Sequence, residues 1–273
     1  MKSLKLVRVF LAIAFFACAN LFFFGLVSWA SLLFKLQLLP SVLALNLLSV
    51  GIVLGVTLLF GRIYCSVVCP MGVFQDLIIW LRRRLAGSKR RIVFAPVRRG
   101  KGIRLVSLLF SAVLIAVGFV SLGALLDGYS LYGRVATQLF KPAYSFVQNL
   151  VAVAQANAGH PWLFREEVFV RSACALTVAS VGLLGVVALA WFRGRFFCNS
   201  LCPVGAALSL VATRPVVKLA IDPDKCVSCG LCAATCSCGA IDAKAKTVDN
   251  PTCVRCFNCL SVCRKKAIGL KVR

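Results

Sequence analysis

Eight cysteines near the carboxyl end of the chain stand in two runs with the same spacing. Each run reads C-x2-C-x2-C-x3-C, the first beginning at Cys226 and the second at Cys253. In such a run three thiolates bind one iron-sulfur cubane and the fourth thiolate reaches the other cubane. We therefore predict two [4Fe-4S] clusters, one held by set one (Cys226, Cys229, Cys232 and Cys263) and one by set two (Cys253, Cys256, Cys259 and Cys236). A zinc site is disfavoured, because four thiolates complete it and the other cysteines of each run stay unexplained.

The residues around the two runs repeat as well. Ile221-Asp222 recurs as Val248-Asp249, at the same interval that separates the two cysteine runs. The repeat predicts a duplicated ferredoxin half, and hence a small α+β domain of the bacterial two-cluster type over residues 218–273.

Three positions in this domain depart from the usual ferredoxin pattern. Ser237 and Arg264 replace the proline that commonly follows the fourth cysteine of each run. Proline is not a ligand, so its loss is expected to change the local turn and the hydrogen bonds to sulfur rather than ligation. Cys238 is an additional thiol, which we predict to be a small buried residue.

A second pair of cysteine motifs lies upstream of the ferredoxin runs. Motif one (residues 61–72) reads Gly-Arg-x-x-Cys-x3-Cys-Pro-x-Gly, and motif two (residues 194–205) repeats the same pattern. Cysteines at i and i+4 share one face of a helix, and the proline after the second one interrupts the helical hydrogen bonds. If a pseudo-two-fold relates the motifs, four thiols converge: Cys65, Cys69, Cys198 and Cys202. These thiols are candidates for a metal or cluster site, a dithiol relay or a partner's anchor, with small packing residues as the alternative.

The composition indicates a membrane protein. Hydrophobic residues make up 60% of the 273 residues, and the mean hydropathy is +0.92, above that of ordinary soluble domains. Cluster assembly needs reduced thiolates, so the cysteine runs are expected in the cytoplasm. A b-type cytochrome is disfavoured, because His160 is the only histidine in the sequence.

Four apolar segments are predicted to position the motifs by spanning the membrane. They are residues 9–34, 40–60, 105–126 and 168–192. They form two repeated helical hairpins, each ending in a cysteine motif on the same side, within a domain of residues 1–217. The aromatic stretch that follows the third segment, residues 127–167, predicts a helix lying at the membrane interface.

The distribution of positive charge predicts the orientation of these spans. The formal net charge is +24, and most of the Lys and Arg residues fall on the side that carries the cysteine motifs. The exceptions are Lys35, Arg134, Lys141, Arg165 and Arg171. Basic loops remain in the cytoplasm, so both termini and the clusters are expected on the cytoplasmic side of a bacterial inner membrane. Nucleic-acid binding is disfavoured, because the charge flanks apolar runs and has no interleaved aromatic motif.

The short connection between the two parts constrains their arrangement. Residues 203–225 are the whole of the chain between Cys202 and Cys226, so the ferredoxin domain is expected directly beneath the hairpins. We also predict that Cys226 lies nearer to Cys198 and Cys202 than Cys253 does. The basic loop from Arg82 to Arg104 is expected to pack against the ferredoxin domain or an acidic partner.

Four spans, paired motifs and a terminal two-cluster ferredoxin together resemble the NapH family, membrane quinol dehydrogenase subunits of periplasmic nitrate reductase systems. The resemblance covers nearly the whole chain. It implies a multi-pass membrane subunit in the lipid bilayer that passes electrons between menaquinol or ubiquinol and a partner iron-sulfur or reductase protein. Sets one and two would carry the clusters. The alternative is a copper reductase or assembly factor, because soft thiolates at the four motif cysteines suit Cu(I).

Overall fold

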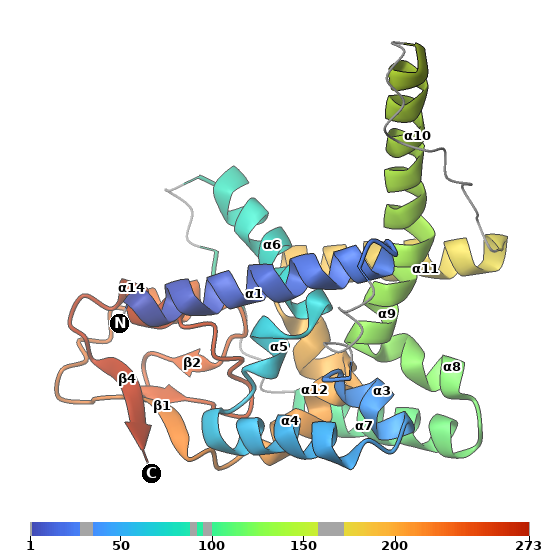
Figure 1. Ribbon diagram of the computed structural model, residues 1–273. Coiled ribbons are helices and arrows are strands. Elements are labelled where there is room, and N and C mark those ends of the chain that lie inside the picture. The colour runs from blue at the N-terminus through green and yellow to red at the C-terminus, as the bar shows by residue number, and fades with distance from the viewer. Residues whose placement is uncertain (1, 28–34, 88–91, 95–99, 158–171, 273) are drawn as a thin grey trace.

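The computed structural model describes residues 2–27, 35–87, 92–94, 100–157 and 172–272. Two helices are long and apolar enough to cross a membrane, within α1 (Lys2–Phe23) and as α11 (Ala173–Arg193). Two further apolar helices, α4 (Leu47–Phe60) and α7 (Gly100–Ala116), are shorter. In Figure 1, α1, α4 and α11 run in a common direction, and the ferredoxin part lies at one end of them.

The first, second and fourth predicted spans correspond to helices with altered limits. Helix α1 ends well before the predicted limit, and residues 28–34 lie outside the described part of the chain. The second span consists of α3 (Leu38–Leu43) and α4, separated by a turn in which Leu45 has a φ of 53°. Helix α11 covers the fourth predicted span from residue 173 onward, and residues 168–171 lie outside the described part of the chain.

The third predicted span is wrong beyond residue 116. Helix α7 ends there because Gly118 adopts a φ of +96°, which a glycine reaches without a steric penalty. The amide of Phe119 donates to the carbonyl of Leu114 at 2.8 Å, as at many glycine-terminated helices. The chain then reverses, and α8 (Val120–Gly123) packs back against α7.

The described part of the segment predicted to lie at the interface, residues 127–157, divides into two parts. After η1 (Ala124–Leu126), helix α9 (Gly128–Val135) packs between α6 (Pro70–Leu85) and α11 with Tyr132 buried, so the interfacial prediction is wrong for α9. Asp127 fixes its start by accepting a hydrogen bond from the amide of Ser130. A π-helical turn, η2 (Ala136–Phe140), leads into α10 (Lys141–Asn157), which extends across the direction of α1 and α11 in Figure 1.

The ferredoxin part shows the predicted duplication. Strand β1 (Val217–Ile221) pairs antiparallel with β4 (Ile268–Val272), and β2 (Ile241–Asp242) pairs with β3 (Thr247–Val248). Helices α13 (Leu231–Thr235) and α14 (Asn258–Val262) begin at equivalent positions of the two repeats and contact each other. Each half therefore contributes one short helix and one strand to each pair.

The ferredoxin part lies directly against the helices, as the short linker predicts. The guanidinium of Arg83 donates to the carbonyl of Thr235 at 3.0 Å, and Arg104 Nη2 donates to Thr252 Oγ1 at 2.7 Å. These bonds confirm that both ends of the basic loop contact the ferredoxin part. The amino-terminal end of α1 lies beside α14 in Figure 1, so this end of the helix is on the same side of the helical part as the ferredoxin part.

Candidate functional site

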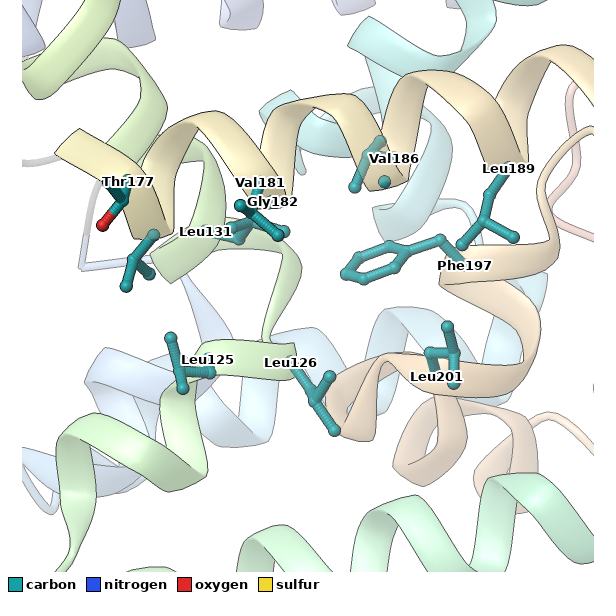
Figure 2. Close-up of a pocket in the computed structure, with 12 residues that line it drawn as sticks. Leu125, Leu126, Leu131, Thr177, Val181, Gly182, Val186, Leu189, Phe197 and Leu201 are labelled. Carbon is teal, nitrogen blue, oxygen red and sulfur yellow. The ribbon is translucent and has the colours of Figure 1, made fainter. Parts of the chain in front are cut away.

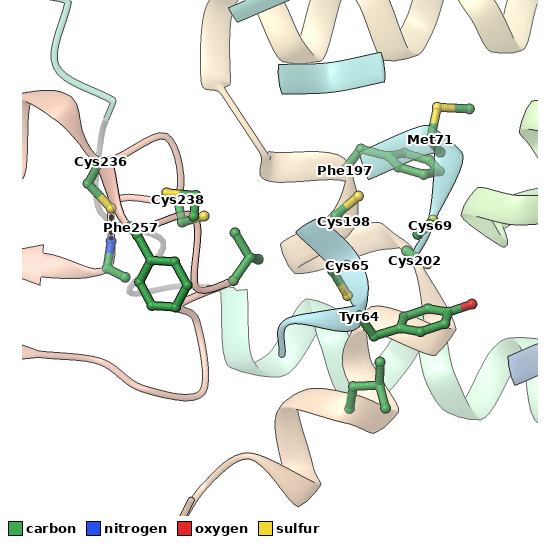
Figure 3. Close-up of a cluster of buried hydrophobic side chains, with 14 of the residues drawn as sticks. Tyr64, Cys65, Cys69, Met71, Phe197, Cys198, Cys202, Cys236, Cys238 and Phe257 are labelled. Atoms are coloured by element: carbon green, nitrogen blue, oxygen red, sulfur yellow. Dashed lines mark hydrogen bonds between the residues drawn. The ribbon is translucent and has the colours of Figure 1, made fainter. Parts of the chain in front are cut away.

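The two upstream motifs meet in the interior of the helical part. Cys65 lies in α5 (Tyr64–Val67) and Cys198 in η3 (Phe197–Leu201). Cys69 and Cys202 are the N-caps of α6 (Pro70–Leu85) and α12 (Pro203–Val211), with each proline at the first helical position, where its missing N–H costs nothing. All four cysteines are buried and lie close together in Figure 3.

The glycine that ends each motif allows a very close approach of two backbone segments. A Cβ atom on Gly72 would lie 2.0 Å from the carbonyl oxygen of Cys65. A Cβ atom on Gly205 would lie 2.1 Å from the carbonyl oxygen of Cys198. Both separations are far below a van der Waals contact, so each motif requires glycine for its helix to fold back on the cysteine turn.

The two motifs exchange their arginines. Arg62 of motif one donates from Nη2 to the carbonyl of Cys198 at 3.0 Å, and Arg195 of motif two donates from Nη1 to the carbonyl of Cys65 at 2.9 Å. Both arginines are fully buried. This reciprocal contact, which we call the arginine exchange, joins the two repeats about a pseudo-two-fold. In the sequence, the arginine exchange is visible only as the Gly-Arg pair that both motifs share. The cysteine spacing, on which the predicted site was based, gives no role to these arginines.

A single carboxylate compensates two of the buried positive charges. Arg195 Nε donates to Asp76 Oδ1 at 2.7 Å, and Arg8 of α1 pairs with the other carboxylate oxygen. Burial opposes ionisation of Asp76, but the guanidinium groups of Arg195 and Arg8 hold the pKa of this carboxyl below its ordinary value. Asp76 therefore ties α1 to both motifs.

The motif thiols are held in an environment that favours their protonated form. Burial raises the pKa of the Cys198 thiol to about 12 and the pKa of Cys69 and Cys202 well above the ordinary value. Gln75 Nε2 donates to the sulfur of Cys198 at 3.3 Å. Binding of a metal ion by these thiols would therefore release protons.

Set one surrounds a cavity at the surface of the ferredoxin part. The cavity has a volume of about 240 Å³, and its lining includes all four set-one cysteines, Cys226, Cys229, Cys232 and Cys263. Cys229 is exposed, and Lys225, Arg264 and Lys265 also line the cavity. Four thiols around one cavity supply the donor type and number that a cubane cluster needs.

Set two is buried on the side that faces the motifs. Cys236, Cys256 and Cys259 are buried, and Cys253 is half-buried. The backbone of the two halves is alike here, because Ser228 and Arg255, at equivalent positions of the two repeats, have φ values of 51° and 56°. Such left-handed residues are costly outside glycine and often mark functional loops.

The motif arginines touch the ferredoxin part beside set two. Arg62 Nη1 donates to the carbonyl of Pro251 at 3.1 Å, and the amide of Arg195 donates to the carbonyl of Ser237 at 2.9 Å. The prediction that Cys226 is the nearer cysteine is therefore wrong. Strand β1 separates the first run from α12, whereas the fold brings the second run and Ser237 back to the motifs. Cys238 is buried, as expected.

The thiols of the described residues are all free. None of the fifteen cysteines forms a disulfide, and no group of three or more His, Cys, Asp or Glu side chains in the described ranges is arranged to hold a metal ion. The four set-one cysteines nevertheless line one cavity, and their donor chemistry fits a cluster.

An apolar cavity adjoins motif two. This space has a volume of about 440 Å³. Figure 2 shows its lining side chains, which come from α11, α9, η3 and the adjoining η1. Phe197 and Leu201, the neighbours of Cys198 and Cys202 in sequence, form one wall, and Gly185 of α11 forms part of another. The cavity therefore extends from the surface of α11 to the turn that carries Cys198.

Comparison with known proteins supports both parts of the site. A family model described as a 4Fe-4S binding domain matches residues 42–89 and again 175–220, which contain motif one and motif two. A second model, also described as a 4Fe-4S binding domain, matches residues 219–242 in the ferredoxin part. Because the first model matches two separate segments, one around each motif, it agrees with the internal repeat of the sequence.

Several curated proteins are similar to this chain. The ferredoxin-type methylamine utilization protein MauN of Paracoccus denitrificans is 27% identical over 64% of this chain and 48% of its own length. The putative electron transport protein YccM of Escherichia coli is 25% identical over 72% of this chain and 47% of its length. The ferredoxin-type protein NapH of Haemophilus influenzae is 25% identical over 71% and 54%.

The chain spans about half the length of these relatives. No solved structure matches it.

Proposed function

Because the chain belongs to the NapH-like polyferredoxin family, we propose that it is a membrane-bound electron-transfer subunit working between the quinol pool and a partner iron-sulfur or reductase protein. The observation that carries the proposal is the direct contact of the ferredoxin part, beside set two, with the paired motifs. This contact joins the part that would lie in the membrane to the part that would carry electrons.

Sets one and two would each hold a [4Fe-4S] cluster, which supplies a one-electron carrier when bound. The chain's own residues prepare these positions differently. Burial of Cys256 and Cys259 excludes water from set two, whereas the exposed Cys229 leaves set one open to solvent. Arg83 and Arg255 place positive charge beside the set-two thiols, which favours an anionic group there.

We propose four spans with both termini and the ferredoxin part in the cytoplasm. Two apolar helices of sufficient length and two shorter ones support this topology. Basic residues gather where the helical part meets the ferredoxin part, and α10, which lies across the other helices, would rest along the opposite interface.

A topology reporter tests this orientation. An enzyme active only outside the cytoplasm should be active when fused after Asn157 and inactive when fused to the carboxyl terminus. A reporter active only in the cytoplasm should give the opposite result at both positions. Activity of the external reporter at the carboxyl terminus would contradict the proposed orientation.

The apolar cavity beside motif two would accept the isoprenoid chain of the quinol. Its walls come from apolar residues of α9, α11 and η3, and it reaches the turn that holds Cys198. A long apolar chain gains free energy from burial in such a space, and the quinol head would then lie near the motifs. The cavity thus connects the bilayer to the buried site.

Filling this cavity tests the quinol site. A Cβ atom on Gly185 would meet no atom within 4 Å, so Gly185→Leu is expected to occupy the cavity without disturbing α11. Reduction of the clusters by ubiquinol should slow about tenfold while cluster content is unchanged. Gly51→Leu is the control, because Gly51 has similarly open surroundings in α4 and does not line the cavity. Equal rates in both variants would exclude this cavity.

Metal analysis distinguishes the alternative function, copper reduction or assembly, from the proposed electron transfer. A variant lacking all eight ferredoxin cysteines keeps Cys65, Cys69, Cys198 and Cys202. Stoichiometric copper retained by this variant and lost on further replacement of those four would favour the alternative. Electron exchange with a quinol in the native protein would favour the proposed function.

A further inference from the structure

The two candidate cluster sites differ in their access to solvent. Set two is enclosed between the ferredoxin part and the motifs, as its buried cysteines and the contact of Arg62 with Pro251 show. Set one surrounds a surface cavity, and Cys229 is exposed. An external protein can therefore approach set one much more closely than set two.

Basic side chains surround the opening of the set-one cavity. Lys225, Arg264 and Lys265, which we call the basic rim, line the cavity and are exposed. Lys225 Nζ lies 3.4 Å from Asp222, but its side chain is 68% exposed, so this pair is weak. Arg264 and Lys265 enter none of the ion pairs found within the described residues. Within the described residues, these two positive charges at the opening therefore take part in no ion pair with a carboxylate.

An apolar side chain completes this surface. Val227, which also lines the cavity, is 64% exposed between Cys226 and Cys229. An exposed apolar residue surrounded by charge is the usual composition of a small, transient interface between electron-transfer proteins. Such interfaces depend on complementary charge for rapid and correctly oriented encounter.

We propose that the basic rim and Val227 form the docking surface for an electron-transfer protein with an acidic face, which exchanges electrons with the chain at set one. The inference rests on the proposed function, and specifies its partner and the place of contact. A docked partner would receive one electron from the reduced cluster of set one, or return one to the oxidised cluster, with no bond formed or broken.

Charge reversal at the rim tests binding directly. The cluster-loaded protein in nanodiscs of neutral phosphatidylcholine is titrated with a small acidic [2Fe-2S] ferredoxin as the probe. The double variant Arg264→Glu, Lys265→Glu should weaken binding about tenfold at low salt, and the difference should shrink at high salt. The matched control is Lys218→Glu, Lys271→Glu, which reverses two exposed bases paired on β1 and β4, away from the cavity.

The binding result has two contrary outcomes. Equal weakening in the rim and control variants would overturn the proposal in favour of a general charge effect. If instead the rim variant differs from the native protein only in nanodiscs containing phosphatidylserine, the rim binds lipid head groups and the docking proposal fails.

Small oxidants separate docking from a change in cluster potential. The clusters are reduced with dithionite, and one electron per cluster is withdrawn by ferricyanide, an anion, or by hexaamminecobalt(III), a cation. In the rim variant, oxidation of the clusters by ferricyanide should be slower and oxidation by hexaamminecobalt(III) should be faster, because the local charge is reversed. A change of the same direction for both oxidants would reflect an altered potential and overturn the proposal. Because dithionite replaces quinol, failure here is distinguishable from failure of the quinol-dependent function.

Discussion

Replacing Asp76 with alanine is expected to destabilise the protein by about 3–5 kcal/mol, the cost of leaving a buried ion pair without one partner. Two guanidinium groups depend on this carboxylate. Arg195 is fully buried and Arg8 is 8% exposed, and both pair with Asp76. The loss should appear as a lower unfolding midpoint in detergent, measured by circular dichroism.

A surface carboxylate supplies the control for this substitution. Asp222 pairs with the exposed Lys225, so Asp222→Ala should leave the free energy of unfolding nearly unchanged. If the two variants unfold alike, the Asp76 pair does not hold α1 to the motifs.

The pH dependence of stability gives a second test of Asp76. Its pKa is lower in the folded protein than the unfolded value of about 3.9, so its stabilisation is present above that value. The contribution is lost as the pH falls through the lower folded pKa. The native protein should therefore lose stability more steeply than Asp76→Asn as the pH falls below about 4. Parallel curves for the two proteins would contradict this assignment.

The sequence predicted the internal repeats of this chain better than the path of its helices. The spacing of the cysteines in each run specified the duplicated ferredoxin half, and the repeated motifs predicted that Cys65 and Cys198 come together. These features are encoded by local spacing and by internal repetition. The short linker also predicted contact between the two parts, because chain length limits separation.

The features that escaped prediction depend on long-range packing. Residues 128–135 are apolar and aromatic, which suits an interface as well as a core, and only contact with α6 and α11 decides between them. The end of α7 depends on the left-handed conformation of Gly118, which its residue type permits without requiring. Set two lies near the motifs because β1 comes between α12 and the first cysteine run and carries that run away, while the fold returns the second run to the motifs.

The arginine exchange was equally hidden, although both arginines belong to the repeat. A buried arginine is understood only once its acceptors are known, and here each arginine donates to a backbone carbonyl in the other motif, far away in sequence. Backbone acceptors carry no residue signature. The recurrence of Gly-Arg in both motifs indicated a shared role but not the crossing of the two side chains.

Alanine at either motif glycine should disrupt this exchange. In Gly205→Ala the new Cβ atom would stand 2.1 Å from the carbonyl oxygen of Cys198, which is also the acceptor of Arg62. The carbonyl must move to relieve this overlap, and the hydrogen bond from Arg62 Nη2 to that carbonyl is then lost. We expect the free energy of unfolding to fall by about 3 kcal/mol, at the upper end for overpacking.

The pseudo-two-fold makes this prediction unusually specific, because Gly72→Ala should have nearly the same effect through Cys65 and Arg195. Gly55→Ala is the control: its Cβ atom would meet nothing within 4 Å in α4, so alanine should stabilise the helix by up to about 1 kcal/mol. The sign of the change therefore separates the motif glycines from an ordinary helical one. Stabilisation by Gly72→Ala or Gly205→Ala would show that the helices after the two prolines do not fold back on the cysteine turns, and the arginine exchange would then lose its structural basis.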